Sequence, residues 1–87
     1  MKRNIELFTI DNCKYCVDAK RELNRRWREG ISIVEYNLSA DMNNKKLLLE
    51  RFSKRPEKLT APQIFIDGIH IGGYDDLMEY FQQTDWS

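Results

Sequence analysis

The sequence has few of the side chains that usually bind transition metals. It contains two cysteines, Cys13 and Cys16, and a single histidine, His70, which lies far along the chain from both. A mononuclear zinc site needs about four ligands, most of them cysteine or histidine side chains. We therefore expect no metal cofactor held within one chain.

The sequence also lacks an excess of charge of either sign and any long apolar run. Lysine plus arginine and aspartate plus glutamate each total 14, so net charge gives no reason to expect nucleic acid or a membrane as partner. The longest purely aliphatic run, residues 47–49, is far too short to span a bilayer. The N-terminal MKRNIELFTI is interrupted by Glu6 and precedes no small-residue cleavage site, so it predicts a strand rather than a signal peptide. Two cysteines and the absence of a signal-peptide pattern indicate a reducing compartment, so we expect a cytoplasmic protein. We also expect it to be a monomer.

The 87 residues have room for one hydrophobic core, so residues 1–87 are predicted to form a single domain. Apolar and β-branched runs alternate with amphipathic segments. A strand–helix–strand first half favours parallel strands, and the second half contains an antiparallel hairpin. We therefore predict an α/β fold in which three helices flank a mixed four-stranded sheet. The predicted order is β-α-β-α-β-β-α, over residues 5–9, 14–29, 31–38, 39–54, 63–66, 69–71 and 74–81.

Two of these elements carry sharper expectations. In the first helix the apolar residues recur at helical spacing, which predicts a buried stripe of Cys16, Ala19, Leu23 and Trp27. The second helix begins at a capping residue, either Ser39 or Asp41.

The clearest local signal is the hairpin QIFIDGIHI, with Asp-Gly as its two-residue loop. A loop of this length pairs Ile66 with Ile69 and Ile64 with Ile71 on one face of the hairpin. His70 then falls on the other face, where we expect it to be exposed and without a role in the site.

The two cysteines flank the start of the first helix. Cys13 precedes the helix and Cys16 lies in its first turn, where free N–H groups and the helix dipole stabilise a thiolate. Lys14 adds a cation, so Cys13 is the predicted nucleophile and Cys16 the resolving thiol. A structural staple is the weaker interpretation, because so short a loop loses little entropy when it is closed. A pair of small buried residues stays open as an alternative.

Three blocks of the sequence together resemble the glutaredoxins, which have the thioredoxin fold. They are CKYC at residues 13–16, TAPQIFIDG at residues 60–68 and IGGYDDL at residues 71–77. The resemblance implies a thioredoxin-like fold and a glutathione-dependent thiol–disulfide oxidoreductase that reduces protein disulfides and glutathione mixed disulfides. It implies glutathione as reductant and partner, and disulfide-containing proteins such as ribonucleotide reductase as substrates.

The resemblance also implies a glutathione-binding set of seven residues. Pro62 resembles the family's cis-proline, which would expose the Ala61 backbone to a peptide-like ligand. The N–H groups of Tyr74 and Asp75 would receive the γ-glutamyl carboxylate, and the Asp75 carboxylate its ammonium. The full set is Tyr15, Thr60, Ala61, Pro62, Gly73, Tyr74 and Asp75.

The sequence departs from the family's pattern at two positions. Lys14 replaces the proline that commonly follows the first cysteine, and a better-stabilised thiolate should make the disulfide a stronger oxidant. Ile10 replaces a lysine that often binds the glycyl carboxylate of glutathione. Three other cations are candidates for binding this carboxylate, namely Arg51, Arg55 and Lys58.

Three other interpretations of the sequence stay open. Some glutaredoxins without the proline bridge a [2Fe–2S] cluster between two subunits, and Lys14 allows this here. A thioredoxin-like reductase recycled by a flavoprotein is a second, because Ile10 weakens the expected glutathione site. A non-catalytic interaction domain is a third, disfavoured by the two intact cysteines.

Overall fold

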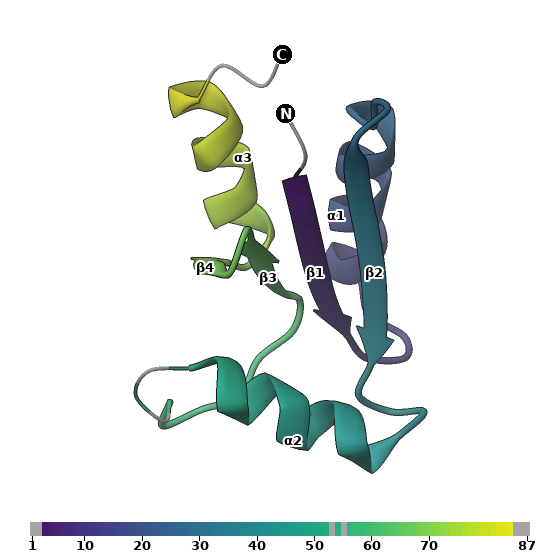
Figure 1. Ribbon diagram of the computed structural model, residues 1–87. Coiled ribbons are helices and arrows are strands. Elements are labelled where there is room, and N and C mark those ends of the chain that lie inside the picture. The colour runs from purple at the N-terminus through teal and green to yellow at the C-terminus, as the bar shows by residue number, and fades with distance from the viewer. Residues whose placement is uncertain (1–2, 53, 55, 85–87) are drawn as a thin grey trace.

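The computed structural model of the chain (Figure 1) describes residues 3–52, 54 and 56–84. Its four-stranded sheet has the strand order β2-β1-β3-β4, in which β1 is parallel to β2 and antiparallel to β3, and β3 is antiparallel to β4. This confirms the predicted mixed sheet with three helices. The elements are β1 Arg3–Thr9, α1 Lys14–Arg25, β2 Ile31–Asn37, α2 Met42–Arg51, β3 Gln63–Ile66, β4 Ile69–Gly72 and α3 Tyr74–Gln83.

The two faces of the sheet carry separate apolar clusters. The larger cluster lies under α1 and α3, which contact each other. Its buried members are Ile5, Leu7, Ala19, Leu23, Ile64, Ile66 and Leu77. The smaller cluster lies on the side of α2, which crosses one end of the sheet in Figure 1, and has Phe8, Leu48 and Phe65 at its centre. Strand alternation therefore splits β1 between the two cores.

The first helix is shorter than predicted. Cys16, Ala19 and Leu23 are buried, as expected, but the helix ends at Arg25. Trp27 therefore leaves the apolar stripe and is 54% exposed, so its assignment to the core was wrong. Its indole N–H instead donates to the Ile31 carbonyl at 2.8 Å, across the connection to β2.

The predicted pairing of the hairpin strands is confirmed next to the loop and is wrong at the far end of the hairpin. Ile66 faces Ile69 as predicted, and Phe65 faces His70, but Ile64 pairs with Gly72 rather than Ile71. A bulge in β4 accounts for the shift, because it leaves one residue more on that strand than on β3.

The second helix begins where one of its two candidate caps predicted. Asp41 accepts the backbone N–H of Asn43 at 2.9 Å, whereas the Ser39 hydroxyl accepts the N–H of Asp11. The helix ends at Arg51, ahead of Pro56. In the part of the chain that the structure describes, no helix is long and apolar enough to cross a membrane.

The burial of Leu23 and the exposure of Trp27 predict different effects on stability when each side chain is removed. We expect Leu23→Ala to lower the free energy of unfolding by about 2–5 kcal/mol, because it opens a cavity in the core. Trp27→Ala should cost less than about 1.5 kcal/mol, since it removes one hydrogen bond and a half-exposed ring. Urea unfolding of both variants decides the matter, and equal losses would contradict the assignment of Trp27 to the surface.

Candidate functional site

The two cysteines form a disulfide at the start of α1. Cys13 is the N-cap residue, with extended backbone angles, and its sulfur accepts the backbone N–H of Cys16 at 3.1 Å. Cys16 is 3% exposed, whereas Cys13 is only partly buried. The more exposed of the two cysteines is therefore the one whose sulfur accepts a hydrogen bond at the positive end of the helix, as a stabilised thiolate requires.

The segment before β3 lies opposite Cys13. The Ala61–Pro62 peptide bond is cis, as the resemblance implied, and Pro62 is buried. The Cys13 sulfur lies 3.9 Å from the Ala61 carbonyl oxygen. Since a disulfide sulfur has no proton to donate, this is a contact rather than a hydrogen bond. It places the Ala61 backbone beside the reactive sulfur.

A groove of about 230 Å³ runs from this segment to the start of α3. We call it the α3 groove. The rings of Tyr15 and Tyr74 stand side by side in its wall, with centroids 6.0 Å apart. The structure brings together all seven residues that the sequence predicted as a binding set, and adds Asp76. The lining is Tyr15, Thr60, Ala61, Pro62, Gly73, Tyr74, Asp75 and Asp76.

The start of α3 is built by two glycines and a carboxylate. The Gly73 N–H donates to Asp76 Oδ2 at 3.0 Å, which closes the first turn. Gly72 has a φ of 121°, and a Cβ at this position would collide with the Asp76 carboxylate. The N–H groups of Tyr74 and Asp75, in the first turn of α3, have no partner within the helix. They are donors suited to an anion in the α3 groove.

A second groove, of about 510 Å³, lies on the α1 and β2 side of the disulfide and includes both cysteines. We call it the β2 groove. Thr9, a residue that is 1% exposed, donates its hydroxyl proton to Glu35 Oε2 at 2.8 Å, and Lys20 Nζ lies 2.6 Å from Glu35 Oε1. The bond from Lys20, aided by Thr9, holds the pKa of Glu35 below its usual value. No sequence motif predicted this network, because its members come from three elements.

A third groove, of about 500 Å³, continues from Thr60 and Ala61 toward α2. We call it the α2 groove. Its remaining lining is Ile10, Leu38, Lys45 and Leu59, so it is apolar with one cation. Sequence reasoning did not select Lys45, since nothing in the local pattern separates it from Lys46.

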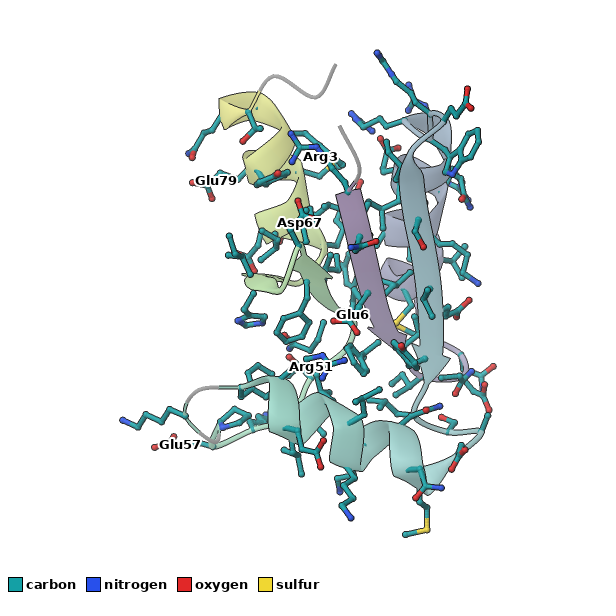
Figure 2. The ribbon with its side chains drawn as sticks, in the orientation of Figure 1. Arg3, Glu6, Arg51, Glu57, Asp67 and Glu79 are labelled. Atoms are coloured by element: carbon teal, nitrogen blue, oxygen red, sulfur yellow. A yellow bond between two sulfur atoms is a disulfide. The ribbon has the colours of Figure 1, made fainter. Side chains whose placement is uncertain are left out.

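The three cations that the sequence analysis selected for the glycyl carboxylate are not found in the lining of these grooves, as far as the structure describes them. Arg51 binds Glu6 of β1 through two nitrogens, at 3.0 and 2.8 Å, and Figure 2 shows these two side chains meeting between α2 and the sheet. Lys58 is exposed and lines none of the three grooves. Arg55 lies outside the described residues.

Comparison with known proteins assigns this arrangement to a family. The Glutaredoxin family model matches residues 5–71. The chain belongs to the glutaredoxin family. It is 45% identical to glutaredoxin 3 of Escherichia coli K12 over 74 residues, which cover 85% of this chain and 81% of the relative. It is 39% identical to glutaredoxin 1 of Rickettsia bellii over 75 residues, or 86% of this chain and 74% of the relative.

Solved structures of glutaredoxins have the same fold. Reduced glutaredoxin of Escherichia coli is 31% identical and superposes with a TM-score of 0.71, over 93% of this chain and 95% of the other. A buckwheat glutaredoxin in complex with glutathione is 26% identical, with a TM-score of 0.66 over 93% and 70% of the two chains. The thioredoxin-like fold predicted from the sequence is confirmed, and the disulfide pair makes the protein a thiol–disulfide oxidoreductase of this family.

The β2 groove predicts a pH-dependent contribution to stability. Glu35 has a lowered pKa in the folded protein, so its ion pair stabilises the fold above the ordinary value of 4.5 and is lost as the pH falls through the folded value. We expect Glu35→Gln to lower the free energy of unfolding at pH 7 by less than about 1 kcal/mol, because the pair is partly exposed.

Urea unfolding of wild type and Glu35→Gln over a range of pH tests this. The gap between the two should close in acid, where Glu35 is protonated in the wild type. Lys20→Gln should show the same trend, because it removes the same pair. A gap that is equally wide at neutral and acidic pH would show that the substitution acts through packing instead.

Proposed function

We propose that the protein is a glutathione-dependent dithiol oxidoreductase that reduces glutathione mixed disulfides and protein disulfides. The observation that carries the proposal is the position of Cys13. Its sulfur accepts a hydrogen bond from the Cys16 N–H and lies beside the Ala61 carbonyl, at the end of the α3 groove. A peptide thiol bound along this groove would meet the sulfur that the helix prepares for attack.

The groove offers a partner for each polar group at the γ-glutamyl end of glutathione. The first-turn N–H groups of Tyr74 and Asp75 suit its carboxylate, and the exposed Asp75 carboxylate suits its ammonium. The backbone of Ala61 can pair with the cysteinyl residue like an added strand. The fold neighbour from buckwheat was solved in complex with glutathione, which supports the same ligand here.

The chemistry on a glutathione mixed disulfide uses Cys13 alone. Its thiolate attacks the glutathione sulfur, and the substrate leaves as a thiolate that takes up a proton. A second glutathione thiolate then attacks the bound glutathione sulfur. Oxidised glutathione leaves and the Cys13 thiolate is restored, so two electrons pass from glutathione to the substrate.

Reduction of a protein disulfide uses both cysteines. Cys13 attacks one substrate sulfur and releases the other, which leaves a mixed disulfide on Cys13. The Cys16 thiolate attacks the Cys13 sulfur and frees the reduced substrate, giving the Cys13–Cys16 disulfide seen in the structure. Two molecules of glutathione then return the pair to the dithiol.

One chain supplies both cysteines and every residue of the α3 groove, which supports a monomer as the working unit. Dithiol chemistry driven by glutathione suits the reducing conditions of the cytoplasm. Among protein substrates, the family resemblance puts the disulfide of ribonucleotide reductase first.

Substitution of each cysteine separates the two reactions. We expect Cys13→Ser to abolish turnover of both substrate types, because it removes the attacking sulfur. Cys16→Ser should retain turnover of a small glutathione mixed disulfide while losing reduction of a protein disulfide. A glutathione-coupled assay on each substrate measures both, and wild type without any glutathione-dependent turnover would refute the proposed function.

Lys45 is the cation that we propose for the glycyl carboxylate of glutathione. It lines the α2 groove together with Thr60 and Ala61, so it lies on the path of a peptide that leaves the α3 groove past the cysteinyl position. Arg51 is engaged in an ion pair with Glu6. Ile10 lines the α2 groove beside Lys45 but has no charge to offer the carboxylate.

Lys46 offers a matched control for this role. Both lysines are exposed on α2, but only Lys45 lines the groove. We expect Lys45→Ala to raise the KM for glutathione about two- to fivefold, the effect of one exposed ion pair. Lys46→Ala should leave this KM unchanged. Equal effects of the two variants would show that Lys45 acts only through long-range charge and does not bind the carboxylate.

A further inference from the structure

Gln63, the first residue of β3, is a buried polar side chain that adjoins the α3 groove, because it follows Pro62 and bonds to Thr60 of the lining. It is 9% exposed and follows the cis-proline. Its Nε2 lies 3.1 Å from the Thr60 carbonyl oxygen and 2.9 Å from the Thr60 hydroxyl oxygen. Its Oε1 lies 2.7 Å from Nε2 of His70 on β4. One side chain thus joins the edge strand of the sheet to the wall of the groove.

The orientation of the Gln63 amide follows from what its partners can do. A carbonyl oxygen only accepts, so the amide nitrogen must face Thr60 and the amide oxygen must face His70. His70 must then donate from Nε2, which makes the neutral ring the Nε2–H tautomer. Nε2 also donates when the ring is doubly protonated, so the bond exists in either charge state.

The ring of His70 is itself held in place. It packs edge-on against Phe52, with ring centroids 5.0 Å apart, and at a tilt against Phe65, with centroids 4.9 Å apart. Burial against these rings lowers the pKa of His70, and the carboxylate of Asp76 opposes the shift. The residue is exposed, as the sequence predicted, but its ring is engaged on three sides.

We propose that His70 is a positioning residue for the substrate groove, acting on Thr60 through Gln63. By donating to Gln63 Oε1, His70 fixes the amide, and the amide fixes both the carbonyl and the hydroxyl of Thr60. Because the Thr60 hydroxyl accepts from Gln63, its own proton remains available to a ligand in the α3 groove. His70 is not itself part of the lining of that groove. The functional part of this proposal rests on the proposed use of glutathione.

Two substitutions at His70 separate its hydrogen bond from its packing. His70→Phe retains a ring against Phe52 and Phe65 but removes the donor. His70→Gln retains an N–H donor at a similar reach but removes the ring. We expect His70→Phe to raise the KM for a glutathione mixed disulfide about three- to tenfold, the loss of about one hydrogen bond, with kcat changed less than about twofold. His70→Gln should stay near the wild-type value.

A double substitution tests whether the effect passes through Gln63. Gln63→Met removes the amide while keeping the volume, so adding His70→Phe should then have no further effect on KM. Ile69→Ala, at an exposed neighbouring position on β4, is the control and should leave KM unchanged. Additive effects of the two substitutions, or an impaired His70→Gln beside a normal His70→Phe, would overturn the proposal.

Nuclear magnetic resonance gives a readout that does not involve glutathione. The His70 ring nitrogens should show the Nε2–H form. His70→Phe should shift both the side-chain amide of Gln63 and the backbone amide of Thr60, whereas His70→Gln should leave the Thr60 amide near its wild-type position. If wild type fails to use glutathione but these shifts occur, the proposed function falls and the positioning of Thr60 stands. An Nδ1–H tautomer, or resonances of Thr60 that ignore His70→Phe, would refute the positioning role itself.

Discussion

The site depends on the hydrogen bond from the Cys16 N–H to the Cys13 sulfur, 3.1 Å long, at the first turn of α1. The Cys13 sulfur accepts the kind of first-turn N–H hydrogen bond that an N-cap side-chain oxygen usually accepts. The helix dipole further stabilises negative charge on this sulfur. The bond requires Cys13 to be the last extended residue and Cys16 to lie one turn on. The spacing of two residues between the cysteines therefore serves both the cap and the disulfide, and α1 must begin at Lys14 for either to form.

The sheet brings the second half of the site to this sulfur. Because β1 and β3 are antiparallel, with Phe8 opposite Gln63, the last residues of β1 and the first residues of β3 lie at the same end of the strands. The loop that carries Cys13 and the segment 60–62 are therefore neighbours, although they are far apart in the sequence. The bulge in β4 and the glycine at 72 then turn the chain into α3 at that same end. Strand direction, with the bulge and Gly72, therefore brings three chain segments to one end of the sheet, beside the Cys13 sulfur.

The sequence predicted what local chemistry determines and missed what the packing of several elements determines. The Asp67–Gly68 loop and the position of both cysteines at the start of α1 are each set within a few residues, and the structure has both. The cap of α2 was predicted as either Ser39 or Asp41, and in the structure it is Asp41. Trp27 was misplaced because the end of α1 depends on how the chain returns to β2. The pairing of Glu35 with Lys20, and of Gln63 with His70, joins residues on different elements. No periodicity in the chain marks such contacts before the sheet register is known.

Under the proposed function, the charges around the grooves would give bound glutathione a direction. At the γ-glutamyl end, glutathione carries both an ammonium and a carboxylate, which need a carboxylate and N–H donors side by side, and the start of α3 has this combination at Asp75. At the glycyl end it carries a carboxylate alone, which needs only a cation, and the α2 groove contains Lys45. A reversed peptide would bring its ammonium to Lys45 and leave the Asp75 carboxylate without a cation. Under the proposed function, therefore, repulsion at the wrong end selects the orientation that points the cysteinyl sulfur at Cys13.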